Sequence, residues 1–161
     1  MPKSKSSRGW LRSIAAVAFV ATAGLAFSAQ AGECPAGKSM PNARQPADVK
    51  GGGVTDTTLG AIDLGTQPAK IAGRELRFRK LTIAPGGIVP WHSHDDRPAL
   101  IYVAEGEIIE YASNCAAPIH HQSGDLRAEK YGTSHWWKNL GDKTVVLYVG
   151  DVRRDPKDHN M

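Results

Sequence analysis

Short extended runs, separated by glycine and proline, dominate the chain after residue 59 and restrict the folds that it can adopt. Residues 74–79 alternate strictly between polar and apolar side chains, which is the pattern of a strand with one buried face. Further apolar or alternating runs follow at 99–103, 107–111, 126–130, 134–140 and 144–149. No window after residue 32 keeps a helical period. The chain is therefore predicted to be all-β, with its strands closed into a barrel or packed as two sheets.

The first 31 residues have the composition of an export signal. Four basic residues precede an uncharged run over residues 13–30, and residues 29–31 (Ala-Gln-Ala) have the small-x-small form that signal peptidase accepts. Cleavage there would release residues 32–161 into the periplasm or the medium. The alternative is an uncleaved membrane anchor, since about twenty uncharged residues could just span a bilayer.

Removal of this segment would also remove the excess positive charge. The chain has 20 Lys and Arg against 16 Asp and Glu, and four of the basic residues but none of the acidic ones lie in residues 1–31. The remainder is neutral, so the net charge of +4 predicts binding neither to nucleic acid nor to an anionic membrane surface. A remainder of about 130 residues is enough for one domain with a hydrophobic core.

Changes in composition along residues 32–161 predict the boundaries of the segments. Residues 32–58 are predicted to be an irregular N-terminal arm, because three prolines and a glycine triplet interrupt every period. The barrel domain is predicted over 59–152, with a loop over 114–124. Residues 153–161 are predicted to be a charged, frayed C-terminal tail.

The two cysteines, Cys34 and Cys115, lie in the predicted arm and loop. In an oxidising compartment such a pair is predicted to form a disulfide, against the alternative of two free thiols. The bond would tie the arm to the barrel, and loop entropy sets an upper contribution of about 4 kcal/mol.

Three histidines form the candidate functional site. His92 and His94 are two positions apart on an extended segment, so both rings point to the same side. His135 follows in a similar aromatic setting. Three neutral imidazoles are suitable ligands for a divalent transition metal such as Fe, Cu, Zn, Ni or Mn. The adjacent pair His120 and His121 would point to opposite sides of the predicted loop, and both are predicted to be surface residues.

Two glycine–histidine motifs around these residues resemble the two signatures of the cupin superfamily. The first motif consists of Gly86, His92, His94 and Gly106. The second motif consists of Gly124, Gly132, His135 and Asn139. The resemblance implies a single jelly-roll β-barrel with a metal centre between the motifs. It also implies that Asn139 closes a turn through its side chain.

The chain departs from the cupin pattern at two positions. Lys130 stands where the second motif has proline, and Ala99 stands where the first motif has a glutamate ligand. Three interpretations follow for Ala99. The three histidines alone could hold the ion, a carboxylate from Asp95 or Asp96 could replace the glutamate, or the site could be a metal-free pocket. Loss of the glutamate would leave a bound ion one unit more positive, which favours an anionic or enolisable ligand.

The remaining expectations concern the pocket and the function. Trp137 has the strand parity of His135 and is expected to line the pocket with Ile101 and Val103, while Arg97 could hold an anionic ligand. The hypothesis is an exported metal-dependent cupin that binds a small organic ligand, with an oxygenase-type activity. The alternative is a non-catalytic periplasmic small-molecule or metal-binding barrel, because no catalytic acid or base is evident beside the ion.

The outward-facing aromatic residues Tyr102 and Trp136 are compatible with a homodimer. No basic-aromatic platform for nucleic acid is present.

Overall fold

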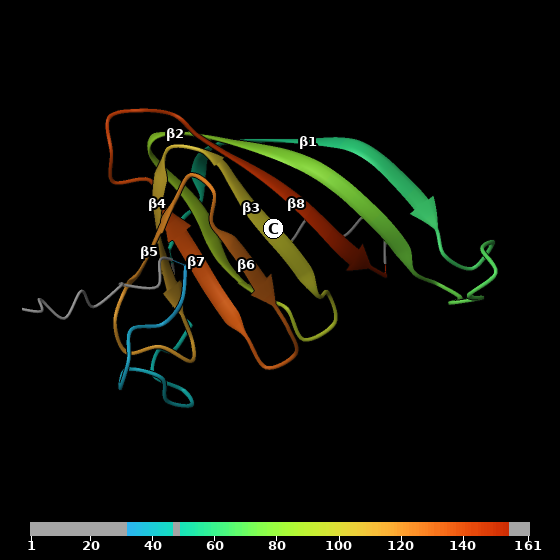
Figure 1. The fold of residues 1–161 in the computed structure, drawn as a ribbon, viewed down its shortest axis with the longest axis horizontal. Helices are drawn as coiled ribbons and strands as arrows, with labels where there is room; N and C mark the ends of the chain where they lie inside the picture. The colour runs from blue at the N-terminus through green and yellow to red at the C-terminus, as the bar shows by residue number, and fades with distance from the viewer. Residues whose placement is uncertain (1–31, 47–48, 155–161) are drawn as a thin grey trace, which may run out of the picture.

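The computed structural model describes residues 32–46 and 49–154, and within these residues all regular elements are β-strands (Figure 1). The predicted all-β fold is confirmed. The predicted signal peptide and the end of the predicted tail lie outside the described residues. The strands are β1 (Gly52–Asp63), β2 (Glu75–Ser93), β3 (Ala99–Glu105), β4 (Glu107–Ala112), β5 (Ile119–Gln122), β6 (Leu126–Glu129), β7 (Ser134–Lys138) and β8 (Val145–Arg153).

The strands form one curled sheet in the order β5-β4-β7-β2-β8-β3-β6, with β1 paired to β2. All pairs are antiparallel. The long strand β2 organises the sheet, because residues 75–83 pair with β8 and residues 88–93 pair with β7. In Figure 1, β4, β5 and β7 lie to one side of the curl, and β3, β6 and β8 lie to the other. The sheet thus curls into a half-barrel, whose edge strands β5 and β6 are not paired with each other.

Alternation along the strands places the hydrophobic core on the inner face of the curl. In β3 every second residue is buried, and in β2 the alternation holds through residue 83. Burial of these side chains is the main stabilising contribution to such a fold. The core consists of Leu81, Ile83, Val89, Ala99, Ile101, Val103, Ile108, Trp137, Val145, Leu147 and Val149.

Described residues depart from the predicted boundaries in three places. Strand β1 begins at Gly52, inside the segment predicted to be irregular. Strand β5 lies in the predicted loop over 114–124, and β8 extends through Arg153, the first residue of the predicted tail. Each of these segments is extended because it pairs with another strand, β1 and β5 with strands adjacent in the chain and β8 with the distant strand β2, and local composition does not reveal these pairings.

The disulfide between Cys34 and Cys115 is present in the structure, with 5.8 Å between the Cα atoms. It joins the irregular segment over 32–46 to the connection between β4 and β5. Backbone hydrogen bonds reinforce the attachment, since Met40 N donates to Asn114 O over 3.0 Å. Among the described residues, no helix is long and apolar enough to cross a bilayer.

Candidate metal centre

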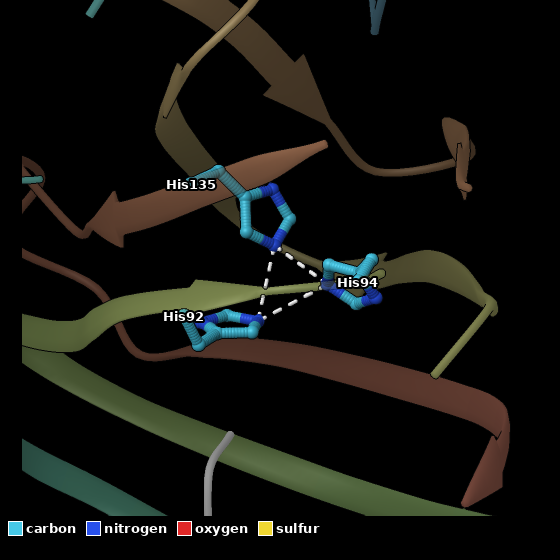
Figure 2. Close-up of side chains that lie close together, drawn as sticks. All are labelled: His92, His94 and His135. Atoms are coloured by element: carbon cyan, nitrogen blue, oxygen red, sulfur yellow. Dashed lines mark hydrogen bonds between the residues drawn. The ribbon is translucent and has the colours of Figure 1, made fainter. Parts of the chain in front are cut away.

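The imidazoles of His92, His94 and His135 converge on one point inside the curled sheet (Figure 2). His92 lies in β2 directly opposite His135 in β7, and His94 follows the last residue of β2. The Nε2 atoms lie 3.2 Å apart for His92 and His94, 3.0 Å for His94 and His135, and 3.1 Å for His92 and His135. All three rings are buried.

Each ring uses its other nitrogen to contact an oxygen acceptor. Nδ1 of His92 lies 2.9 Å from Pro90 O, and Nδ1 of His94 lies 2.7 Å from Arg97 O. Nδ1 of His135 lies 2.8 Å from Oε1 of Glu110. Because these oxygens accept hydrogen bonds, the contacts favour a proton on each Nδ1, which leaves the Nε2 atoms of the three rings facing one another.

This arrangement fits a divalent transition metal. Bonds of about 2.1 Å from one ion to three imidazole nitrogens would place those nitrogens about 3.0–3.4 Å apart. The Nε2 separations of 3.0–3.2 Å fall within that range. Each Nδ1–H contact would also fix the tautomer that a metal ligand needs.

The three histidines differ in their affinity for protons. Burial and the charge of His135 lower the pKa of His92 well below its ordinary value and lower that of His94 to about 4. Burial alone would also lower the pKa of His135, but the charge of Glu129 and the hydrogen bond to Glu110 outweigh it and raise that pKa to about 9. In the metal-free protein one proton therefore belongs to His135, while the other two rings remain neutral.

A buried carboxylate network lies behind His135. This carboxylate network comprises Glu110, His121, Arg127 and Glu129, and all four side chains are buried. Nε2 of His121 donates to Oε2 of Glu110 over 2.8 Å, and Nε of Arg127 donates to Oε1 of Glu129 over 2.9 Å. Burial raises the pKa of Glu110, but the hydrogen bonds from His121 and His135 outweigh this effect and lower it below the ordinary value.

Sequence reasoning missed this network and predicted wrongly that His121 is a surface residue. His121 is completely buried, whereas His120 is exposed and pairs with Glu107. Strand parity could have found Glu110, because it alternates with the apolar residues Ile108 and Ala112 and therefore shares their inner face. The short strand β6 gives no comparable apolar alternation around Glu129.

A small cavity of about 20 Å³ adjoins the histidines, enough for about one water molecule. The predicted pocket residues Trp137 and Ile101 both line it, and Trp137 also packs edge-on against the ring of His135. Val103 belongs to the core but does not line this cavity. Its lining consists of Arg79, Leu81, Val89, His92, His94, Ile101, Trp137, Leu147 and Val149.

The two arginines near the site have different positions. Arg79 lines the cavity, although sequence reasoning did not select it, and it forms an ion pair with Asp56. Arg97 does not line the cavity but a separate surface depression that also includes His92. Its Nε lies 3.9 Å from Oδ2 of Asp151, which Arg77 contacts with two nitrogens. Arg79 is therefore the one arginine that lines the cavity, and its charge already faces Asp56 and Asp151, with Nε 3.9 Å from Oδ2 of Asp151.

The two aspartates considered as substitute ligands are engaged elsewhere. Oδ1 of Asp95 accepts from the backbone N–H of Gly132 over 2.8 Å, and Asp96 pairs with Arg74 and Arg154 at the surface. Both carboxylates are exposed and neither belongs to the histidine cluster. This arrangement does not support the interpretation that an aspartate replaces the glutamate ligand.

Asn139 closes the turn after β7 as expected. Its Nδ2 contacts the carbonyl oxygens of Ile83, Ala84 and Lys143, and its Oδ1 accepts from Gly141 N. The side chain thus joins the bend of β2 to the β7–β8 connection. It fixes the histidine-bearing strands relative to each other without contacting the histidines.

Comparisons with known proteins agree with this fold. Residues 79–150 match the family model described as a cupin domain. Germin-like protein subfamily 2 member 1 of Arabidopsis thaliana is 31% identical over 96 residues, which cover 56% of this chain and 44% of that protein. The chain thus spans less than half the length of this curated relative.

Solved structures share the architecture at low sequence identity. A conserved protein with a double-stranded β-helix domain from Klebsiella pneumoniae superposes with a TM-score of 0.51 at 18% identity, covering 70% of this chain and 84% of that one. An oxalate oxidase in complex with the substrate analogue glycolate superposes with a TM-score of 0.50 at 20% identity, covering 73% and 57%. At these identities the likeness establishes the fold alone.

Proposed function

The chain belongs to the cupin superfamily, and from this premise we propose that it is an exported metal-binding cupin. His92, His94 and His135 would hold one divalent transition metal through their Nε2 atoms. The observation that carries the proposal is the convergence of three Nε2 atoms within 3.0–3.2 Å, each ring held by an acceptor at Nδ1. A metal bound there would act as a Lewis acid with positions open to an outside ligand.

The ligand that we propose is a small organic anion. The cavity beside His92 and His94 has apolar walls and one buried cation, Arg79, whose Nε has no hydrogen-bond partner among the described residues. The cavity of about 20 Å³ holds about one water molecule in this structure, so even a small organic anion would require its lining side chains to move apart. One oxalate oxidase of this fold is recorded with the substrate analogue glycolate, a small hydroxy acid, and this precedent supports the same ligand class here.

Two functions remain to be separated, an oxygenase-type enzyme and a non-catalytic carrier of a metal or small molecule. The cavity lining includes two histidines and one arginine but no carboxylate, so no general base is placed beside a ligand there. This observation favours the carrier. The enzyme would be favoured if the loaded protein consumed dioxygen in the presence of a small hydroxy or keto acid, measured with an oxygen electrode.

The metal content of the protein tests the proposed function. Residues 32–161 should be purified from the periplasm without a histidine tag, beside His92→Ala and His92→Ala/His135→Ala variants. We expect near-stoichiometric metal in the native protein and none in the double variant, measured by elemental analysis. Asn139→Ala is a matched control, because this buried residue supports the same strands without contacting the rings. Native protein that cannot be loaded with any divalent ion would overturn the proposal.

Export is proposed on two grounds, the composition of residues 1–31 and the disulfide between Cys34 and Cys115. Mass spectrometry of the mature protein tests it, because cleavage after Ala31 would give a chain that begins at Gly32. A full-length chain recovered from the membrane fraction would instead indicate the uncleaved anchor.

We also propose a homodimer through the outer face of the sheet. Exposed apolar side chains from neighbouring strands lie on that face, where paired residues such as Tyr102 and Leu126 share a side. Patches of this kind commonly mark interfaces. Trp136, by contrast, is half-buried and stacks on Tyr111. Sedimentation should show a dimer that Leu100→Glu dissociates, and a monomer at all concentrations would contradict the proposal. The face comprises Leu76, Phe78, Leu100, Tyr102 and Leu126.

A further inference from the structure

We propose that the carboxylate missing from the metal's ligand set acts from behind His135, where Glu110 and Glu129 position this ring through Nδ1. The negative charge would thus be retained near the ion, while the coordination position that a glutamate would occupy is left to an outside ligand. This inference rests on the proposed metal-binding function and assigns positioning roles to two residues that do not touch the metal.

The first observation is the place of Glu129 in the sheet. Ala99 in β3 is paired directly with Glu129 in β6, so the two side chains point to the same inner face. Both residues are buried, with 6% and 2% of their surface exposed. A buried carboxylate is therefore present on the strand next to the one where the cupin pattern has its glutamate ligand.

The second observation is where this carboxylate reaches. Nδ1 of His135 lies 2.8 Å from Oε1 of Glu110 and 3.2 Å from Oε1 of Glu129. Nε2 of the same ring faces the other two histidines. The imidazole thus stands between the carboxylates and the metal centre. A histidine whose N–H is held by a carboxylate is fixed in orientation and becomes a more basic ligand.

The third observation is the balance of buried charge. Glu110 and Glu129 contribute two negative charges, and Arg127 contributes one positive charge to both of them, with Nε 3.3 Å from Oε2 of Glu110 and 2.9 Å from Oε1 of Glu129. Arg127 also reaches Glu33, which is largely exposed and therefore screened by solvent. One buried negative charge thus remains behind His135, which is the charge that a directly bound glutamate would have supplied.

The fourth observation indicates that the protein alone does not complete this network. Oε2 of Glu129 is buried and has no hydrogen-bond partner among the described residues. A buried carboxylate oxygen without a partner is costly, and a cation nearby would offset this cost. Arg127 already lies 2.9 Å from the other oxygen of this carboxylate, and a divalent ion on the far side of the His135 ring would add to that stabilisation.

The consequence concerns the ligand. An ion held by three imidazoles has one more open position than an ion held by three imidazoles and a carboxylate. Because the balancing charge remains in the carboxylate network, a chelating anion could use this position without competing with a carboxylate already bound to the ion. The arrangement therefore favours a ligand with two donor oxygens over one with a single donor.

Zinc affinity tests the positioning roles. We expect Glu110→Gln and Glu129→Gln each to weaken Zn²⁺ binding about 10- to 100-fold, measured by competition with a chromophoric chelator. The matched control is Glu107→Gln, since Glu107 lies on the same strand as Glu110 but is exposed and pairs only with His120 among the described residues. It should leave the affinity unchanged within about twofold.

Two further measurements separate positioning from a merely structural role. In ¹H–¹⁵N spectra of the zinc-loaded protein, Nδ1 of His135 should carry a strongly downfield-shifted proton. That resonance should move upfield in both glutamine variants, whereas general destabilisation would lower the melting temperature without moving it. Adding Ala99→Glu to the Glu129→Gln variant should restore affinity, because it returns a carboxylate to the inner face.

The outcomes distinguish this proposal from the proposed function. Wild-type protein that binds zinc through its histidines, together with glutamine variants that bind equally well, would overturn the positioning roles and leave the metal centre intact. Wild-type protein that binds no divalent ion would overturn both. If the variant with Ala99→Glu does not fold, the two single glutamine variants and the Nδ1 resonance decide the question.

Discussion

The ring of His135 separates two buried polar regions that are built on different principles. On its Nε2 side lies the histidine cluster, where three rings converge beside a small cavity and have no anion among them. On its Nδ1 side lies the carboxylate network, where Glu110 and Arg127 have partners within the protein. In the first region three nitrogen atoms that can coordinate a metal face one another, so this region is suited to binding an ion. The second is nearly complete, and it stabilises the fold and orients the ring.

Removal of the Arg127 guanidinium from the carboxylate network should have the largest effect on the stability of the protein. Arg127→Met leaves two buried carboxylates without their shared cation, so we expect a loss of about 3–5 kcal/mol in the free energy of unfolding. Urea denaturation measures it. The matched control is Arg154→Met, which removes a cation from an exposed pair with Asp96 and should leave the midpoint unchanged. Equal midpoints for the two variants would contradict a stabilising network.

Removal of the disulfide should have the next largest effect, and it should act on the network side alone. Cys34→Ala/Cys115→Ala frees the segment that carries Glu33 beside Arg127. We expect a loss of about 2–4 kcal/mol in the free energy of unfolding, because the unfolded chain gains entropy. Metal stoichiometry should be unchanged. A variant that unfolds like wild type would contradict the stabilising role of the disulfide. A variant that loses its metal while folded would show that the two regions depend on each other.

Metal should stabilise the histidine side. Zinc at about 100 times its dissociation constant is expected to add about 2.7 kcal/mol to the free energy of unfolding, since the ion binds the folded state. The increase should be absent in His92→Ala. Chelator-treated protein measured by denaturation with and without zinc provides the test, and equal stabilisation of the variant would place the metal elsewhere.

The pH dependence of the metal-free protein should reflect the environments of all three histidines. Below pH 6.5 the unfolded state protonates His92 and His94 while the folded state keeps them neutral, with a pKa of about 4 for His94, so stability falls. Above pH 6.5 the folded state retains the proton on His135 up to its pKa of about 9, so stability falls again.

Stability should therefore be greatest near pH 6.5, with slopes of at most about 1.4 kcal/mol per pH unit for each proton. The acid limb should be the steeper one, because two histidines contribute to it and one to the other. Zinc should remove the alkaline fall, because bound metal displaces the proton from His135. A monotonic profile in the chelated protein would contradict these assignments.

Much of the histidine side could be predicted from the sequence, whereas on the network side strand parity indicates only the inward position of Glu110. The spacing of His92 and His94 places both rings on one side, and the second motif supplies His135. Glu110 lies on β4, which pairs with the strand of His135, but Glu129 lies on β6 at the other edge of the sheet and meets His135 only because the sheet curls. His121 was misplaced because its segment was predicted to be a loop, whereas it forms strand β5, which pairs with β4 and turns this ring inward.

By itself, the sequence determined the strand-rich architecture, the trio of histidines and the loss of the glutamate at Ala99. These features depend on side-chain alternation and motif spacing, which are local properties of the chain. The tertiary structure alone decided that Glu129 stands opposite Ala99 and that its carboxylate meets Nδ1 of His135. That outcome depends on the register between β3 and β6, which is fixed by packing across the whole sheet.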